Sequence, residues 1–207
     1  MDQMKKLIKR LISNRYFAFS GKVKDKRIAL TFDDGPHVDH TEDILKILKS
    51  ENVKATFFVI GKEAERHPAL VRHMAEDQHE VANHSYWHSR KGGVEEIKET
   101  EKSIEGIVGS SPRLFRPPWG RIGLKKLLYT ATSNMKIVLW SFDSHDYKFN
   151  TAEELRRHLR RSRISAGDIL LFHEDYAHTK EALPDILTDL KTRGFEFRTV
   201  SELLGKS

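Results

Sequence analysis

The stretch IALTFDDGP, residues 28–36, runs from an apolar segment directly into two adjacent carboxylates and a Gly-Pro turn. A short apolar run bounded by turn residues is typical of a buried strand. We therefore predict a strand over 28–32, with Asp33 and Asp34 just past its carboxyl end. An isolated Asp-Asp-Gly sequence of this kind would indicate only a solvated turn.

Further runs of the same kind alternate with stretches of helical periodicity along the rest of the chain. The predicted strands cover residues 28–32, 55–60, 80–83, 113–115, 137–142, 168–172 and 195–200. The predicted helices cover residues 41–50, 68–76, 94–108, 123–133, 152–163 and 180–193. Thr41 and Thr151 are suited to cap the first turns of their helices.

Alternating strands and helices predict parallel strands joined by crossover helices, either in an open sheet or in a barrel. The polar residues that follow individual predicted strands are Asp33, Asp34, His84, Arg116, Asp143, Asp146 and His173. A closed parallel barrel would bring these positions to one rim, whereas an open sheet would spread them along an edge. We therefore predict a single α/β domain, a distorted or incomplete (β/α) barrel of about seven parallel strands, fewer than the usual eight.

His84 and His88 are the second chemical signal. Two histidines four residues apart can project from the same side of a helical turn and reach one ion, with a carboxylate as the third ligand. Three protein ligands leave a position for water, as in catalytic zinc-type sites. The chain has no Cys, so His, Asp or Glu must hold any metal. One of Asp33 and Asp34 would coordinate, and the other would stay free to accept a proton.

Five motifs in chain order resemble those of the polysaccharide deacetylases, the NodB-homology domains of carbohydrate esterase family 4. The motifs are TFDDGP (31–36), HSYWH (84–88), RPPWG (116–120), DSHDY (143–147) and LLFH (170–173). The similarity extends from about residue 26 to residue 204. It implies a metal-dependent hydrolase that removes N-acetyl groups from an N-acetylhexosamine-containing polysaccharide or oligosaccharide, with a metal-activated water.

The resemblance also implies roles for individual residues. The catalytic set is Asp33 as base, His173 as the acid for the departing amine, Asp146 as the partner of His173, and Arg116 to orient Asp33. The metal ligands are Asp34, His84 and His88. The expected oxyanion and substrate contacts are Trp119, Pro118, Tyr147 and Leu171. The implied cofactor is one divalent ion, Zn²⁺ in the first place, with Co²⁺, Mn²⁺ or Ni²⁺ as alternatives.

Other functions fit parts of the same pattern. The site could serve an O-acetyl esterase, or a deacylase of a lipid-linked sugar at a membrane face. A non-catalytic carbohydrate-binding protein of this fold would be indicated by the loss of Asp33, Asp34 or a metal histidine. None of these residues is missing.

The net charge of +6 is concentrated in residues 1–27, which contain nine Lys or Arg against Asp2 and Asp25. The remaining 180 residues sum to a net charge of −1. A body of this charge is not a general polyanion-binding surface, and we expect no nucleic-acid partner. The arginines in residues 156–163 indicate a solvated helix face.

The basic N-terminal segment has its own pattern, with apolar residues at helical spacing from Met4 to Ile12 and Lys or Arg between them. We predict a basic amphipathic helix in residues 1–20 and a catalytic domain in residues 21–207. The helix either packs on the domain or contacts a membrane surface through residues 4–12. Lys9 and Arg10 break the apolar stretch that a signal peptide would need. We therefore expect a cytoplasmic or membrane-associated protein. We also expect a monomer.

Overall fold

The stretch that opens the motif series forms β2 (Arg27–Asp33), the central strand of the sheet. The computed structural model describes residues 16–205, and in it β2 pairs with β3 (Thr56–Val59) on one side and β8 (Ile169–His173) on the other. The start of β2 also pairs with β9 (Glu196–Arg198). All residues of β2 after Arg27 are buried, which is why this strand is apolar on both faces.

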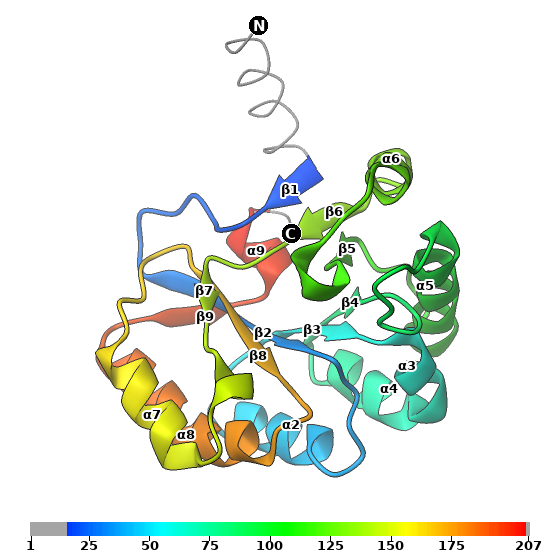
Figure 1. Ribbon diagram of the computed structural model, residues 1–207. Helices are drawn as coiled ribbons and strands as arrows, with labels where there is room; N and C mark the ends of the chain where they lie inside the picture. The colour runs from blue at the N-terminus through cyan, green and yellow to red at the C-terminus, as the bar shows by residue number, and fades with distance from the viewer. Residues whose placement is uncertain (1–15, 206–207) are drawn as a thin grey trace, which may run out of the picture.

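The sheet follows the order β1-β6-β5-β4-β3-β2-β8-β7 (Figure 1). Its other members are β1 (Phe17–Ala18), β4 (Glu80–Asn83), β5 (Leu114–Phe115), β6 (Lys136–Val138) and β7 (Phe142–Asp143). The ladders that join these strands are parallel. Among residues 16–205, no ladder joins the two end strands, β1 and β7. The predicted α/β fold, an incomplete parallel barrel in one domain, is confirmed.

Helices surround the strands, and Figure 1 shows α7, α8 and α2 along one side and α3, α4 and α5 along another. The α-helices are α2 (Thr41–Ser50), α3 (Gly61–Arg66), α4 (Pro68–Glu76), α5 (Val94–Val108), α6 (Leu124–Thr132), α7 (Ala152–Arg161), α8 (Ala177–Thr192) and α9 (Val200–Leu203). Two 3-10 turns, η1 (Pro118–Gly120) and η2 (Asp146–Lys148), lie after β5 and β7. The main core packs the helices against Phe32, Phe57 and Phe172.

Three predicted helices, α2, α4 and α5, have the predicted bounds. The prediction of one strand over 137–142 is wrong, because the chain leaves the sheet after β6 and rejoins it as β7 beside β8. Thr151 caps α7 through a complete capping box, as predicted. Thr41 is instead the first helical residue, and its hydroxyl accepts a hydrogen bond from the backbone N–H of His37 at 2.7 Å.

The amphipathic helix predicted over residues 4–12 lies outside the described residues, as does its proposed membrane contact. Phe17 and Ala18, which the sequence assigned to the N-terminal segment, pair with β6 as strand β1. Short elements such as β1, α3 and α9 were missed because they span too few residues to show a period. From residue 16 to residue 205, no helix has the length and apolar character that crossing a bilayer requires.

The close contact between Gly167 and Gly21 fixes the segment that follows β1, and a substitution at Gly167 tests this contact. Its φ is +86°, and a Cβ there would collide with the carbonyl oxygen of Gly21, whose N–H donates to Gly167 at 2.7 Å. We expect Gly167→Ala to lower the free energy of unfolding by about 2–4 kcal/mol. Gly109→Ala is the control, since Gly109 has φ +78° and open space around it, and should cost about 1 kcal/mol. Urea unfolding measures both, and equal losses would contradict this account.

Candidate active site

Strands β2 and β8 end side by side and bring two functional side chains to one rim. Their register pairs Asp33 with His173, and neighbouring strands lie about 4.8 Å apart. Residues that pair in this way point to the same side of a sheet. The site therefore has a carboxylate and an imidazole opposite each other at the carboxyl ends of parallel strands, where barrels of this class carry active sites.

Asp33 is held by a buried arginine. Nη1 of Arg116 donates to Oδ1 of Asp33 at 2.6 Å and to the hydroxyl of Thr31 at 2.8 Å. The guanidinium also donates to the carbonyls of Val138 and Leu139, both at 3.3 Å. Burial lowers the pKa of Arg116, and the charge of Asp33 opposes that effect. One oxygen of Asp33 is therefore fixed, while the other, Oδ2, lies 3.6 Å from Nε2 of His84.

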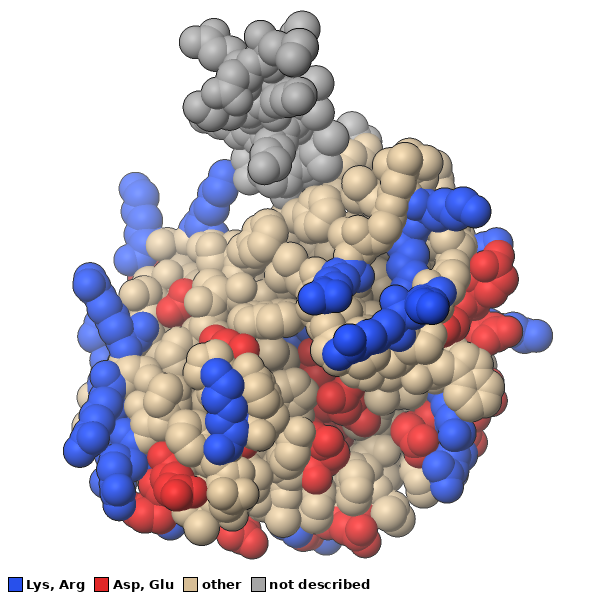
Figure 2. Space-filling view, in the orientation of Figure 1, with Lys and Arg blue, Asp and Glu red and all other residues tan. Residues whose placement is uncertain are grey.

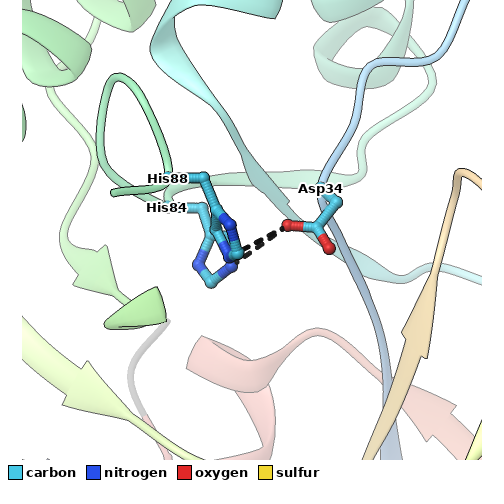
Figure 3. Close-up of side chains that lie close together, drawn as sticks. All are labelled: Asp34, His84 and His88. Carbon is cyan, nitrogen blue, oxygen red and sulfur yellow. Dashed lines mark ion pairs between the residues drawn. The ribbon is translucent and has the colours of Figure 1, made fainter. Parts of the chain in front are cut away.

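Asp34, His84 and His88 converge on one point (Figure 3). Oδ1 of Asp34 lies 3.5 Å from Nε2 of His84 and 3.3 Å from Nε2 of His88. Asp34 has a left-handed backbone, with φ of 70°. This turn separates its carboxylate from that of Asp33, although the two residues are adjacent in sequence.

The prediction that His84 and His88 share a helical turn is wrong. They lie in the loop after β4, where Ser85 and His88 both have positive φ and fold the chain back. The side chain of Asn83 accepts from the N–H of Ser85 at 2.9 Å and so supports this turn. The two imidazole rings still come within 4.9 Å of each other, so the pairing was predicted correctly but the local structure was not.

The chemistry of this cluster fits a divalent cation. One ligand atom from each of Asp34, His84 and His88 lies within 4.8 Å of the others. Oδ1 of Asp34 is buried and has no hydrogen-bond partner among the described residues. Nδ1 of His84 donates to the carbonyl of Arg116 at 2.7 Å, which directs Nε2 toward the cluster, as metal-binding histidines require. Burial raises the pKa of Asp34, but the two imidazoles outweigh it and lower the pKa to about 2.

His173 forms a tight pair with Asp146, which is fully buried in η2. Oδ1 of Asp146 accepts from Nδ1 of His173 at 2.7 Å, and Oδ2 accepts from the backbone N–H of His173 at 2.7 Å. The hydroxyl of Thr179 donates to Oδ2 at 3.1 Å. Burial lowers the pKa of His173, but Asp146 and the more distant Asp33 and Asp34 raise it to about 9. His173 is therefore protonated at neutral pH.

These groups line one cavity of about 420 Å³. The residues around it are Asp33, Asp34, His84, His88, Pro117, Trp119, Trp140, Asp143, Tyr147, Leu171, His173 and Tyr176. Trp119, Tyr147 and Leu171, which the resemblance implies as substrate contacts, all line this cavity. Pro118 is buried and its neighbour Pro117 lines the cavity instead. Trp140 and Tyr176 were missed, because an aromatic residue beside a strand gives no signal that separates a wall from a core.

Glu174 is a further residue that the sequence did not single out. It is fully buried beside the Asp33-Asp34 loop, bonded to the hydroxyl of Thr41, and a Cβ at Gly35 would collide with its carboxyl group. Burial raises its pKa to about 8, so it is neutral at pH 7 and adds no charge beside Asp34. The only signal in the sequence is that Glu174 directly follows His173. Together with Asp175 it resembles an ordinary pair of surface acids.

The geometry has counterparts among known proteins. Residues 20–138 match the polysaccharide deacetylase family model. A peptidoglycan-N-acetylglucosamine deacetylase of Bacillus cereus is 35% identical over 200 residues, covering 92% of this chain and 73% of the relative. The chain belongs to the polysaccharide deacetylase family.

Solved structures of the same family have the same architecture. The Bc1960 peptidoglycan N-acetylglucosamine deacetylase is similar with a TM-score of 0.88 at 34% identity, over 96% of this chain and 97% of that one. A CE4 family pseudoenzyme from Bacillus anthracis is similar with a TM-score of 0.83 at 28% identity, over 92% of this chain and 69% of that one. The resemblance predicted from the five motifs is confirmed, and with it the class of hydrolase: a polysaccharide deacetylase, from a family of metalloenzymes.

Arg116→Lys tests the buried contact on which the deacetylase site is built. Lysine keeps the positive charge, but one nitrogen cannot satisfy the oxygens of Asp33, Thr31 and two carbonyls together. We expect the substitution to lower the free energy of unfolding by about 2–4 kcal/mol. Arg113→Lys, an exposed change close by in sequence, should stay within about 0.5 kcal/mol of the wild type. Denaturant midpoints measure both, and similar midpoints for the two variants would refute the assignment.

Proposed function

We propose that this deacetylase removes the N-acetyl group from N-acetylglucosamine residues of a peptidoglycan-type glycan. The observation that carries the proposal is the placement of Asp33 and His173 opposite each other, with the Asp34-His84-His88 cluster beside them. The relatives named as peptidoglycan deacetylases support the choice of glycan. Because a pseudoenzyme shares this fold, the argument for turnover depends on these side chains and not on the fold.

In this proposal Asp33 is the base. Arg116 binds Oδ1 and leaves Oδ2, which lies 3.6 Å from Nε2 of His84, to take a proton from the attacking water. The water oxygen forms a bond to the acetyl carbon, and the carbon–nitrogen bond of the amide breaks. The products are acetate and a free amine on the sugar.

His173 is the acid in this proposal. An amine leaves readily only when it receives a proton, and His173 carries one at neutral pH because Asp146 holds its pKa at about 9. Nδ1 faces Asp146, so Nε2 is the nitrogen that donates. Asp146 acts through His173, as a positioning and charge-setting residue.

The cation in this proposal is zinc, held by Asp34, His84 and His88. Two imidazole nitrogens and one carboxylate oxygen suit Zn²⁺, and also Co²⁺ or Ni²⁺, better than they suit Mg²⁺ or Ca²⁺. When bound, such an ion polarises the acyl oxygen and lowers the pKa of a coordinated water. Trp119 has a left-handed backbone, with φ of 54°, beside the cavity, and we assign its backbone N–H to the acyl oxygen.

Release of acetate tests the proposed reaction. We expect the protein to release acetate from N-acetylglucosamine oligomers and from peptidoglycan strands, to lose at least about 90% of this activity on chelation, and to regain it with zinc or cobalt. An O-acetylated glycan without N-acetyl groups is the control substrate. Release from the O-acetylated control alone would replace the proposed amide hydrolysis with ester hydrolysis.

Asp146→Asn tests the proposed acid. Without the carboxylate charge of Asp146, burial lowers the pKa of His173 and only the more distant Asp33 and Asp34 still raise it. The proposed reaction needs the protonated imidazole. The pH above which kcat falls should therefore be lower in Asp146→Asn than in the wild type, by at least about one pH unit. Asp185→Asn, which removes an exposed acid on α8, should leave the profile in place. An unshifted high-pH limb in Asp146→Asn would contradict the role of His173.

A further inference from the structure

A second hollow lies beside the active-site cavity and is strongly basic. It has a volume of about 750 Å³ and lies between residues 90–95, which precede and begin α5, and residues 121–126, which lead into α6. The cations that line it are Arg90, Lys91, Arg121, Lys125 and Lys126. Figure 2 shows Lys and Arg side chains gathered over the region of η1 and α6.

The charges of this basic hollow are not neutralised by neighbouring acids. None of its five cations forms an ion pair within 4 Å of a carboxylate in residues 16–205. Two arginines of α7 differ, because Arg156 pairs with Asp185 at 2.7 Å and with Glu153 at 3.2 Å, and Arg157 pairs with Glu153 at 3.8 Å. Glu95, the acid that lines the basic hollow, pairs outside it with Lys98 at 4.0 Å. Five cations without an ion pair in the described part of the chain therefore line one hollow, and together they attract an anion.

Lys126 is the buried member of the basic hollow. Lys126 is only 9% exposed. Its ammonium group nevertheless forms no ion pair within the described residues. The carboxylate of Glu96 is near enough to act on its charge, but it accepts from the backbone N–H of Trp87 and from the hydroxyl of Ser89. The stem of Lys126 is therefore packed against the protein, while its ammonium lines the basic hollow without a paired carboxylate.

The basic hollow adjoins the catalytic cavity, and Trp119 lies between a residue of each. The guanidinium of Arg90 lies over the indole of Trp119, 5.3 Å from its centre, and the same indole lies 4.4 Å from the ring of His88. Arg90 follows His88 by two residues, and Arg121 follows Trp119 by two. The two segments that supply His88 and Trp119 to the catalytic cavity therefore leave it together and line the basic hollow.

We propose that the basic hollow binds a carboxylate of the same glycan whose acetyl group occupies the catalytic cavity, on a sugar or sugar substituent next to the reacting residue. This inference rests on the proposed function and narrows its substrate class to anionic glycans. Charge-assisted hydrogen bonds from lysine and arginine are stronger than neutral ones. A carboxylate bound in the basic hollow positions the glycan chain and takes no part in the chemistry.

The test compares the wild type, a variant and a control on three substrates. The variant is the double substitution Arg121→Glu and Lys125→Glu, and the control is Arg160→Glu and Arg161→Glu on the exposed face of α7, which changes the net charge equally. The substrates are a neutral N-acetylglucosamine oligomer, peptidoglycan strands with free carboxylates, and the same strands after amidation of those carboxylates. Circular dichroism checks folding, and Arg121→Gln with Lys125→Gln serves if the glutamates disturb it.

We expect kcat/KM of the variant to fall by at least about tenfold on the carboxylate strands, through KM, and to stay within about twofold on the neutral oligomer and the amidated strands. In the wild type, added salt should raise KM for the carboxylate strands only. The control should behave as the wild type. An equal loss on all three substrates, or no loss on the carboxylate strands, would overturn the proposal.

Failure of the proposed function gives a different result. If the wild type deacetylates none of the three substrates, binding of the carboxylate strands is measured directly by fluorescence anisotropy with the wild type and the variant. Weaker binding by the variant, by at least about fivefold, would support the basic hollow on its own. Equal binding would reject it.

Discussion

The buried ion pair between Arg116 and Asp33 is the contact on which the site depends. A guanidinium without solvent exposure is stable only when its donors are satisfied, and Arg116 meets this condition through Asp33, Thr31 and the carbonyls of Val138 and Leu139. These partners come from β2 and from the end of β6, so one side chain connects strands far apart in sequence. The backbone carbonyl of Arg116 also orients His84, and the arginine therefore links the proposed base to the Asp34-His84-His88 cluster.

This contact explains how two adjacent aspartates can have different chemistry. Asp33 is still part of β2, where Arg116 occupies one of its oxygens. Asp34 turns away in a left-handed conformation and faces His84 and His88. The opposite side of the cavity repeats the arrangement, since the buried carboxylate of Asp146 fixes His173 and keeps it charged. Each proposed proton carrier is thus held by an oppositely charged side chain behind it.

Much of this could be predicted from the sequence, since helical and strand periods located most elements and motif order located Asp33, Asp34, His84, His88 and His173. Three features could not be predicted. The His84-His88 loop depends on positive φ angles, which residue spacing does not encode, and Glu174 looks like a surface acid until its burial is known. The basic hollow was hidden because residues 28–207 sum to −1. Net charge does not distinguish a paired arginine, such as Arg156 on α7, from unpaired ones such as Arg90 and Arg121.

Metal content measured together with acetate release in Asp33→Asn and Asp34→Asn tests the central claim, the division of labour between the two aspartates, most directly. The account predicts that Asp33→Asn keeps about one equivalent of metal and loses at least about 100-fold in kcat, because the base is gone and the ligands remain. It predicts that Asp34→Asn loses the metal itself. The reverse result, with metal lost in Asp33→Asn and kept in Asp34→Asn, would contradict the account.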